Sequence, residues 1–242
     1  MKKIKFIAAA AALLALTVTG FAFAGCGGTD VEKDEPLPEG KTSYVYEAED
    51  VDLYGLSGPV FSGEASDYKM VMGANTKYIR ENYPEVLESI SNQYFVSYFN
   101  GPGTILTFTF DSDKASSGNT LKLRMASEWG TLNIKPTNII VRINGEELNY
   151  EPFTISGVKL SDDGSLGQYR TPFKDYTLTE DFDIVEGENI IEVEVGDRDY
   201  GLEGFVKYGP GIDCIKMVTD SNVTLTWEKL FESRKSNIVV EN

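Results

Sequence analysis

The stretch Tyr46-Glu47-Ala48-Glu49-Asp50 lies near the start of the region, from Ser43 onward, in which short runs of aromatic and β-branched residues dominate. Its two glutamates alternate with the other three residues, which is the period of an extended strand and predicts both glutamates on one strand face. Two like charges on one face repel, and burying them without a partner costs several kcal/mol each. No Lys or Arg follows within the next fifteen residues, so the pair needs a cation from elsewhere.

A hard cation with oxygen ligands, calcium above all, satisfies such a pair of carboxylates. Asp213 lies in a late apolar strand expected at Ile212–Val218, and it supplies a third carboxylate if that strand lies beside the first. The sequence therefore predicts a structural calcium bound by Glu47, Glu49 and Asp213. The alternative is that both glutamates are solvated on an exposed strand face.

The stretch YEAED at 46–50 and the stretch GPGID at 209–213 together resemble the carbohydrate-binding modules of families 6 and 35. The resemblance spans residues 44–219 and implies an antiparallel β-sandwich of the jelly-roll type. It also implies a calcium ion on the two glutamates and the late aspartate, and a polysaccharide or glycan as ligand. In sugar-binding members an Asn that touches the ligand often precedes the late Ile-Asp pair, whereas this chain has Gly211 there.

Residues 1–25 have the pattern of a secretory signal peptide. Three early lysines precede the apolar run Phe6–Phe23, and the small residues Ala24-Gly25 then precede Cys26. The stretch Phe23–Cys26 resembles a bacterial lipobox, which implies cleavage before Cys26 and lipidation of its thiol. The expected location is thus the cell surface of a bacterium, anchored to its membrane; the alternative is ordinary cleavage that leaves Cys26 free. Residues 26–42 are nearly devoid of apolar side chains and are expected to form a flexible tether.

Charge and composition exclude several classes of function. Residues 26–242 carry 19 basic and 38 acidic side chains, a net charge of −19, which argues against nucleic acid as a partner. The chain has no His, so His-dependent triads and His zinc ligands are excluded. Cys214 is left without a disulfide partner and is interpreted as a small buried apolar residue. A monomer is expected.

From residue 43 to residue 242 we predict one all-β domain, because short aromatic and β-branched runs alternate with Gly, Asn and Asp turns. One short inserted helix is expected at Pro84–Ser91, where Pro fits the first turn. Asn144-Gly145 indicates a two-residue hairpin turn. Strands are expected at Tyr68–Met72, Tyr94–Phe99, Thr104–Phe110, Leu121–Ala126, Ile139–Ile143, Glu146–Tyr150, Phe173–Phe182, Ile190–Val195 and, as a strand or short helix, Val223–Trp227.

A glycan ligand is expected to bind at loops that carry aromatic rings, because sugar rings stack on flat apolar side chains. Trp129 lies in one such loop, and Tyr200, Phe205 and Tyr208 lie in another, between Asp197 and Gly211. Arg124, on the strand leading to Trp129, is expected to add hydrogen bonds. The alternative is that these rings fill the ends of the sandwich core.

The hypothesis that follows is a non-catalytic, calcium-containing carbohydrate-binding module. Two other classes stay open. A glycoside hydrolase needs two carboxylates about 5 to 10 Å apart, and none of the 38 acids lies in a recognisable catalytic motif. A structural or protein-interaction sandwich without a glycan ligand is favoured by Gly211 and by the helical insertion.

Overall fold

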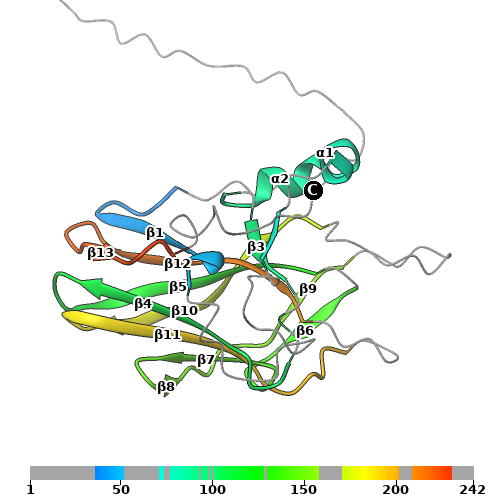
Figure 1. Cartoon of the computed structure of the whole chain (residues 1–242). Coiled ribbons are helices and arrows are strands. Elements are labelled where there is room, and N and C mark those ends of the chain that lie inside the picture. The colour runs from blue at the N-terminus through cyan, green and yellow to red at the C-terminus, as the bar shows by residue number, and fades with distance from the viewer. Residues whose placement is uncertain are drawn as a thin grey trace, which may run out of the picture. The chain divides into compact units, whose positions relative to one another are not determined.

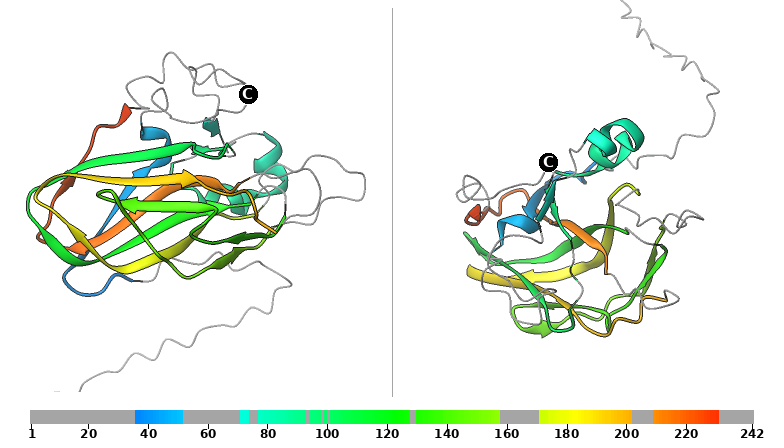
Figure 2. Two further views of the ribbon diagram at one scale, coloured as in Figure 1. Left: turned by 90° about the horizontal axis from the view of Figure 1, so that it is seen from below. Right: turned by 45° about the vertical axis from the view of Figure 1, so that its right-hand side comes forward.

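Two antiparallel sheets pack face to face around the hydrophobic core (Figures 1 and 2). The computed structural model describes residues 36–51, 71–73, 77–92, 94–97, 99, 101–127, 130–157, 171–201 and 209–230. Within these residues no helix is long and apolar enough to cross a bilayer.

The first sheet has the strand order β10-β5-β12-β3-β2, and β1 pairs with β12 beside β3. All of its pairings are antiparallel. Its strands are β1 (Lys41–Glu47), β2 (Val71–Gly73), β3 (Tyr94–Val96), β5 (Ser116–Ala126), β10 (Lys174–Ile184) and β12 (Gly211–Asp220).

The second sheet has the order β13-β4-β11-β7-β8 and is also antiparallel throughout. Its strands are β4 (Ile105–Ser112), β7 (Ile139–Ile143), β8 (Glu146–Glu147), β11 (Gly187–Val195) and β13 (Leu225–Thr226). A separate two-stranded sheet pairs β6 (Leu132–Ile134) with β9 (Phe153–Ile155).

The core forms because alternate residues of each strand point between the sheets, as the period of two requires. Leu121, Leu123 and Met125 of β5 are fully buried, as are Leu106 and Phe108 of β4. Each large apolar side chain removed from water in this way contributes about 1.5 to 3 kcal/mol. The predicted all-β sandwich is therefore confirmed.

The C-terminal strand closes the sandwich against β1. The ring of Trp227, which follows β13, stacks on Tyr46 with centroids 4.7 Å apart and an interplanar angle of 11°. The Tyr44 hydroxyl donates a hydrogen bond of 2.7 Å to the carbonyl of Val223. The segment Val223–Trp227, predicted as a strand or a short helix, therefore contains a short strand that lies in the second sheet beside β4.

The helical insertion differs from the prediction. Two short helices occur in place of one, α1 (Lys77–Asn82) and α2 (Pro84–Ser89), with Pro84 in the first turn of α2 as expected. Val86 and Ile90 pack with Phe95, Ala126 and Phe173, a small cluster separate from the main core. Since Ala126 points away from the main core, α2 covers the outer face of the first sheet, as Figure 1 shows.

Most strand predictions are correct within a few residues. The Asn144-Gly145 turn joins β7 to β8 with φ values of 51° and 84°, the left-handed conformations that a tight hairpin requires. β1 begins at Lys41, two residues inside the predicted tether. β6 and β9 were not predicted, because three-residue strands carry too little alternation to be recognised.

Candidate functional site

The YEAED stretch is not a continuous strand. β1 ends at Glu47, and Ala48–Asp50 form one turn of 3₁₀ helix, η1. The prediction that alternation places both glutamates on one strand face is therefore wrong. The chain bends after Glu47, and this turn carries Glu49 into the structure, where its side chain is fully buried.

A β-bulge in β12 brings two consecutive side chains together. Ile212 pairs with Met125 and Cys214 pairs with Arg124, so the register shifts at Asp213. A bulge places two residues opposite one and re-aims their side chains. Asp213 and Cys214 thus lie close together, and both are fully buried.

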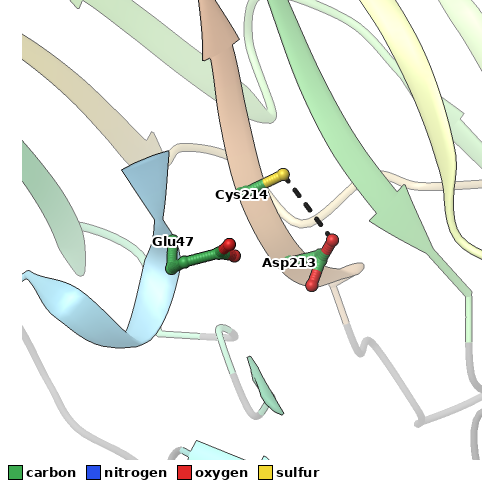
Figure 3. Close-up of side chains that lie close together, drawn as sticks. All are labelled: Glu47, Asp213 and Cys214. Atoms are coloured by element: carbon green, nitrogen blue, oxygen red, sulfur yellow. Dashed lines mark hydrogen bonds between the residues drawn. The ribbon is translucent and has the colours of Figure 1, made fainter. Parts of the chain in front are cut away.

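Three side chains from β1 and β12 meet at one point (Figure 3). Glu47 pairs with Cys214 across the two strands. Ligand atoms of Glu47, Asp213 and Cys214 all lie within 4.8 Å of one another. The Glu47 carboxylate points from β1 toward the other two side chains, which are carried by β12 (Figure 3).

Ser91, which follows α2, donates hydrogen bonds to this group. Its amide and its hydroxyl lie 3.2 Å and 3.0 Å from Asp213 Oδ2, and the same hydroxyl lies 2.5 Å from Glu47 Oε2. The Cys214 thiol is a third donor to Asp213 Oδ2, at 3.6 Å. The helical insertion therefore holds one side of the site.

The remaining oxygens lack partners. Both carboxylate oxygens of Glu49 and Oδ1 of Asp213 are buried without a hydrogen-bond partner among the described residues. Buried polar groups in native proteins are almost always hydrogen-bonded or bound to an ion. Among the described residues, Glu47 and Asp213 belong to the group whose ligand atoms lie within 4.8 Å of one another, whereas the third predicted ligand, Glu49, lies outside that group. We call Glu47, Glu49 and Asp213 the carboxylate cluster; its unpartnered oxygens are hard ligands of the kind that calcium takes.

Burial dominates the electrostatics of the carboxylate cluster. Removal from water raises the pKa of Glu49 to about 8, with the Glu47 charge adding to the rise and with the Glu49 backbone amide and the Asn92 side chain opposing it. The same cause raises the pKa of Glu47 to about 7 and that of Asp213 to about 6, against the hydrogen bonds from Ser91. A cation among the three carboxylates would reverse these shifts, because it favours the charged forms.

A second carboxylate on the same sheet has its own cations. Asp175 accepts from Arg124 at 2.6 Å and lies 2.8 Å from Lys216 Nζ, and these contacts hold its pKa below the usual value despite burial. We call Asp175, Arg124 and Lys216 the ion-pair site. Arg124 also donates to the Ser89 carbonyl at 3.3 Å, and its side chain is only 15% exposed. Arg124 therefore directs donors at Asp175 and Ser89, and its contact with a glycan stays a prediction.

Tyr200 is corrected as a ligand contact. Its side chain is 1% exposed and belongs to the main core, so neither face of its ring can stack on a sugar. Gly209 accommodates this packing, since a Cβ there would lie 2.5 Å from the Phe99 carbonyl oxygen and 3.1 Å from the Tyr200 hydroxyl. For this ring, filling the end of the core was the correct alternative.

The other predicted ligand contacts, Trp129, Phe205 and Tyr208, lie outside the described residues, as does the lipidation residue Cys26. Ser91 was missed by the sequence reasoning, because a serine after a helical segment gives no signal of a contact with a distant strand. Cys214 was correctly expected to be buried, but its place beside two carboxylates depends on the bulge.

Comparisons with known proteins give only distant similarity. Neither a family model nor a curated protein matches the chain. Among solved structures it is similar to the Podospora anserina GH26-CBM35 β-(1,4)-mannanase at 16% identity and a TM-score of 0.40, covering 76% of this chain and 28% of that one. It therefore spans little more than a quarter of the mannanase.

Two isolated family 35 carbohydrate-binding modules (CBM35) give similar values. The CBM35 from Cellvibrio japonicus Abf62 is 17% identical with a TM-score of 0.39, covering 76% of this chain and 96% of the module. The CBM35 from Paenibacillus barcinonensis is 18% identical with a TM-score of 0.37, covering 77% of this chain and 99% of the module.

Proposed function

We propose that this chain is a carbohydrate-binding β-sandwich domain in which a calcium ion ties β1 to β12. The observation that carries the calcium part is the carboxylate cluster, where three buried oxygens have no hydrogen-bond partner among the described residues. The carbohydrate part rests on the resemblance of the YEAED and GPGID stretches to carbohydrate-binding modules, together with the β-sandwich fold.

The calcium ion would be held by Glu47, Glu49 and Asp213. Its positive charge would offset the negative charge of these three carboxylates. Calcium prefers six to eight oxygen ligands, so backbone carbonyls or water would complete the set. Because Glu47 and Glu49 belong to β1 and η1 while Asp213 belongs to β12, the ion would join the two ends of the domain. Its role is stability.

Glycan binding is proposed at the loops of Trp129, Phe205 and Tyr208, away from the calcium ion. With Arg124 engaged by Asp175 and Tyr200 in the core, the ligand would depend on these three rings. Gly211 supplies no amide side chain, so the expected affinity is millimolar to high micromolar, equivalent to about 4 to 6 kcal/mol.

The test is a titration against a panel of plant and microbial glycans, followed by isothermal titration calorimetry, which does not depend on Trp129 as the reporter. The double variant Trp129→Ala with Tyr208→Ala should lose the binding, whereas Trp227→Phe, which changes the ring stacked on Tyr46, should keep it. Binding that survives the double variant would place the ligand elsewhere.

A second function is favoured by the burial of Tyr200, which removes one of the five predicted contacts, and by the ion pair of Arg124 with Asp175. Under this alternative the domain is a structural or protein-interaction module. The absence of binding across the glycan panel, with a calcium response intact, would support it over the carbohydrate-binding function.

We also propose that the chain is attached to a bacterial membrane through lipid on Cys26, from the signal-peptide pattern and the Ala24-Gly25-Cys26 end. Stable anchoring needs more than one acyl chain, and lipidation of an N-terminal cysteine attaches several. Cys26→Ser should release a soluble form. A Cys26→Ser protein that remains in the membrane fraction, with residues 1–25 still attached, would refute the cleavage and the anchor together.

A further inference from the structure

Cys214 places a sulfur atom among the oxygen ligands of the candidate calcium site. The bulge at Asp213 is the reason, because it brings Asp213 and Cys214 together and leaves Glu47 opposite Cys214 on β1. Ligand atoms of the three residues lie within 4.8 Å of one another, with Sγ 3.6 Å from Asp213 Oδ2 (Figure 3). This set differs from the carboxylate cluster by exchanging Glu49 for Cys214.

The two sets suit different ions. Calcium is a hard cation and takes oxygen, whereas zinc and cadmium accept a thiolate together with carboxylates. Asp213 is fully buried and its Oδ1 has no hydrogen-bond partner among the described residues, so an acceptor oxygen is available beside the sulfur. Glu47 is only partly buried, unlike Asp213 and Cys214.

The two kinds of ion differ in what they do to the thiol proton. Calcium gains too little from sulfur to displace the thiol proton, whereas a thiophilic ion replaces it with a metal–sulfur bond and the proton leaves to solvent. Occupancy by the second kind of ion therefore requires both the sulfur and the two carboxylates.

We propose that Glu47, Asp213 and Cys214 bind a thiophilic divalent ion of the zinc class, in competition with calcium. The competition rests on the proposed calcium site, because Glu47 and Asp213 belong to both ligand sets. Glu49 belongs only to the calcium set, and Cys214 belongs only to the thiophilic set. The domain would thus exchange one ion for the other according to their concentrations outside the cell.

The test uses cadmium alone as the probe, in the full chain carrying Cys26→Ser, so that Cys214 is the single thiol. A sulfur-to-cadmium charge-transfer band in the ultraviolet should rise and saturate at one equivalent. Glu49→Gln should retain the band, and Glu47→Gln should weaken cadmium binding about tenfold or more. Added calcium should raise the cadmium concentration at which the band reaches half of its maximum absorbance.

The failures of the two proposals are distinguishable. A calcium response without a cadmium band in the chain with Cys214 would overturn the thiophilic site alone. A cadmium band without any calcium response would leave the thiophilic site standing and remove the calcium site and the competition. A band of unchanged affinity in Glu47→Gln would show binding to the thiol without the carboxylate and would overturn the ligand set.

The variant Cys214→Ser completes the comparison, with the calcium-dependent rise in melting temperature as its measurement. It should keep that rise, while Glu49→Gln should lose it. Loss of the calcium response in Cys214→Ser but not in Glu49→Gln would contradict the assignment of these residues to separate ligand sets. Should Cys214→Ser fail to fold, the band in Glu49→Gln and Glu47→Gln still decides the proposal.

Discussion

The carboxylate cluster and the ion-pair site both lie along the first sheet, yet they treat buried negative charge in opposite ways. At the ion-pair site, Arg124 and Lys216 lie 2.6 Å and 2.8 Å from Asp175 and hold its pKa below the usual value. At the carboxylate cluster, burial raises the pKa of all three acids, and Glu49 has no hydrogen-bond partner among the described residues.

The difference shows that the protein's own side chains compensate the buried charge at the ion-pair site but not at the carboxylate cluster. A buried carboxylate is tolerated when cations or hydrogen-bond donors compensate for lost hydration. The ion-pair site supplies that compensation from two strands, whereas at the carboxylate cluster Ser91 and Cys214 supply donors to Asp213 but not to Glu49. We infer that the missing compensation is a bound ion.

The largest effect is expected from breaking the ion-pair site with Arg124→Met. Asp175 would keep Lys216 but lose the bidentate contact with the guanidinium, and Glu47 and Asp213 would lose a nearby positive charge. The free energy of unfolding should fall by about 3 to 5 kcal/mol, the range for removing one partner of a buried pair. Urea denaturation measures it.

The matched control is Lys135→Met, which breaks the exposed pair between Lys135 and Asp199. Exposed pairs contribute about 0 to 1 kcal/mol, so this variant should unfold close to the wild-type urea concentration. Equal losses of unfolding free energy in the two variants would mean that the ion pairs of Arg124 stabilise the protein no more than an exposed surface pair does.

The pH dependence of stability should distinguish the two regions. Each acid of the carboxylate cluster has a pKa raised to between about 6 and about 8, against about 4 in the unfolded chain. Stability from these groups is full below pH 4 and is lost as the pH rises through 6 to 8. Metal-free protein should therefore lose several kcal/mol of stability between pH 5 and pH 8.

Asp175 has the opposite sign. Because its pKa is lowered, its contribution is present above about pH 4 and is lost as the pH falls below that value. Melting in chelator across this pH range should show the decline toward pH 8, and calcium should reduce it. A metal-free protein that gains stability from pH 5 to pH 8 would count against uncompensated charge at the carboxylate cluster.

Glu49→Gln should stabilise the metal-free protein. The substitution keeps the shape of the side chain and removes a charge that is fully buried without a partner among the described residues. In chelator at pH 8 the free energy of unfolding should rise by about 1 to 3 kcal/mol. Glu188→Gln, at an exposed position of β11, is the control and should change it little.

The sequence predicted the sandwich well and the site only in part. Aromatic and β-branched alternation located most strands, and the two motifs at 46–50 and 209–213 indicated that Glu47 and Asp213 lie close together, but not that Cys214 rather than Glu49 completes their group. The 3₁₀ turn at Ala48–Asp50 and the bulge at Asp213 were not predictable, because each interrupts the alternation on which strand prediction depends. Tyr200 was misassigned because burial in a loop is set by tertiary packing.

The smallest effect is expected from Ser91→Ala. It removes the hydroxyl that lies 2.5 Å from Glu47 Oε2 and 3.0 Å from Asp213 Oδ2, while the backbone amide contact remains. The free energy of unfolding should fall by about 1 kcal/mol, and the apparent calcium affinity should fall slightly. Ser117→Ala, at an exposed position of β5, is the control. Identical unfolding free energies and calcium affinities for the two variants would show that Ser91, and with it the helical insertion, does not stabilise the site.

The most direct measurement of the central claim is the melting temperature in chelator and in calcium for wild type, Glu49→Gln and Asp213→Asn. At a calcium concentration a hundred times the dissociation constant, wild type should gain about 2.7 kcal/mol. Both variants should lose that gain, and Glu49→Gln should melt above wild type in chelator. Identical wild-type melting curves in chelator and in calcium would contradict the account, as would a full calcium gain in Glu49→Gln.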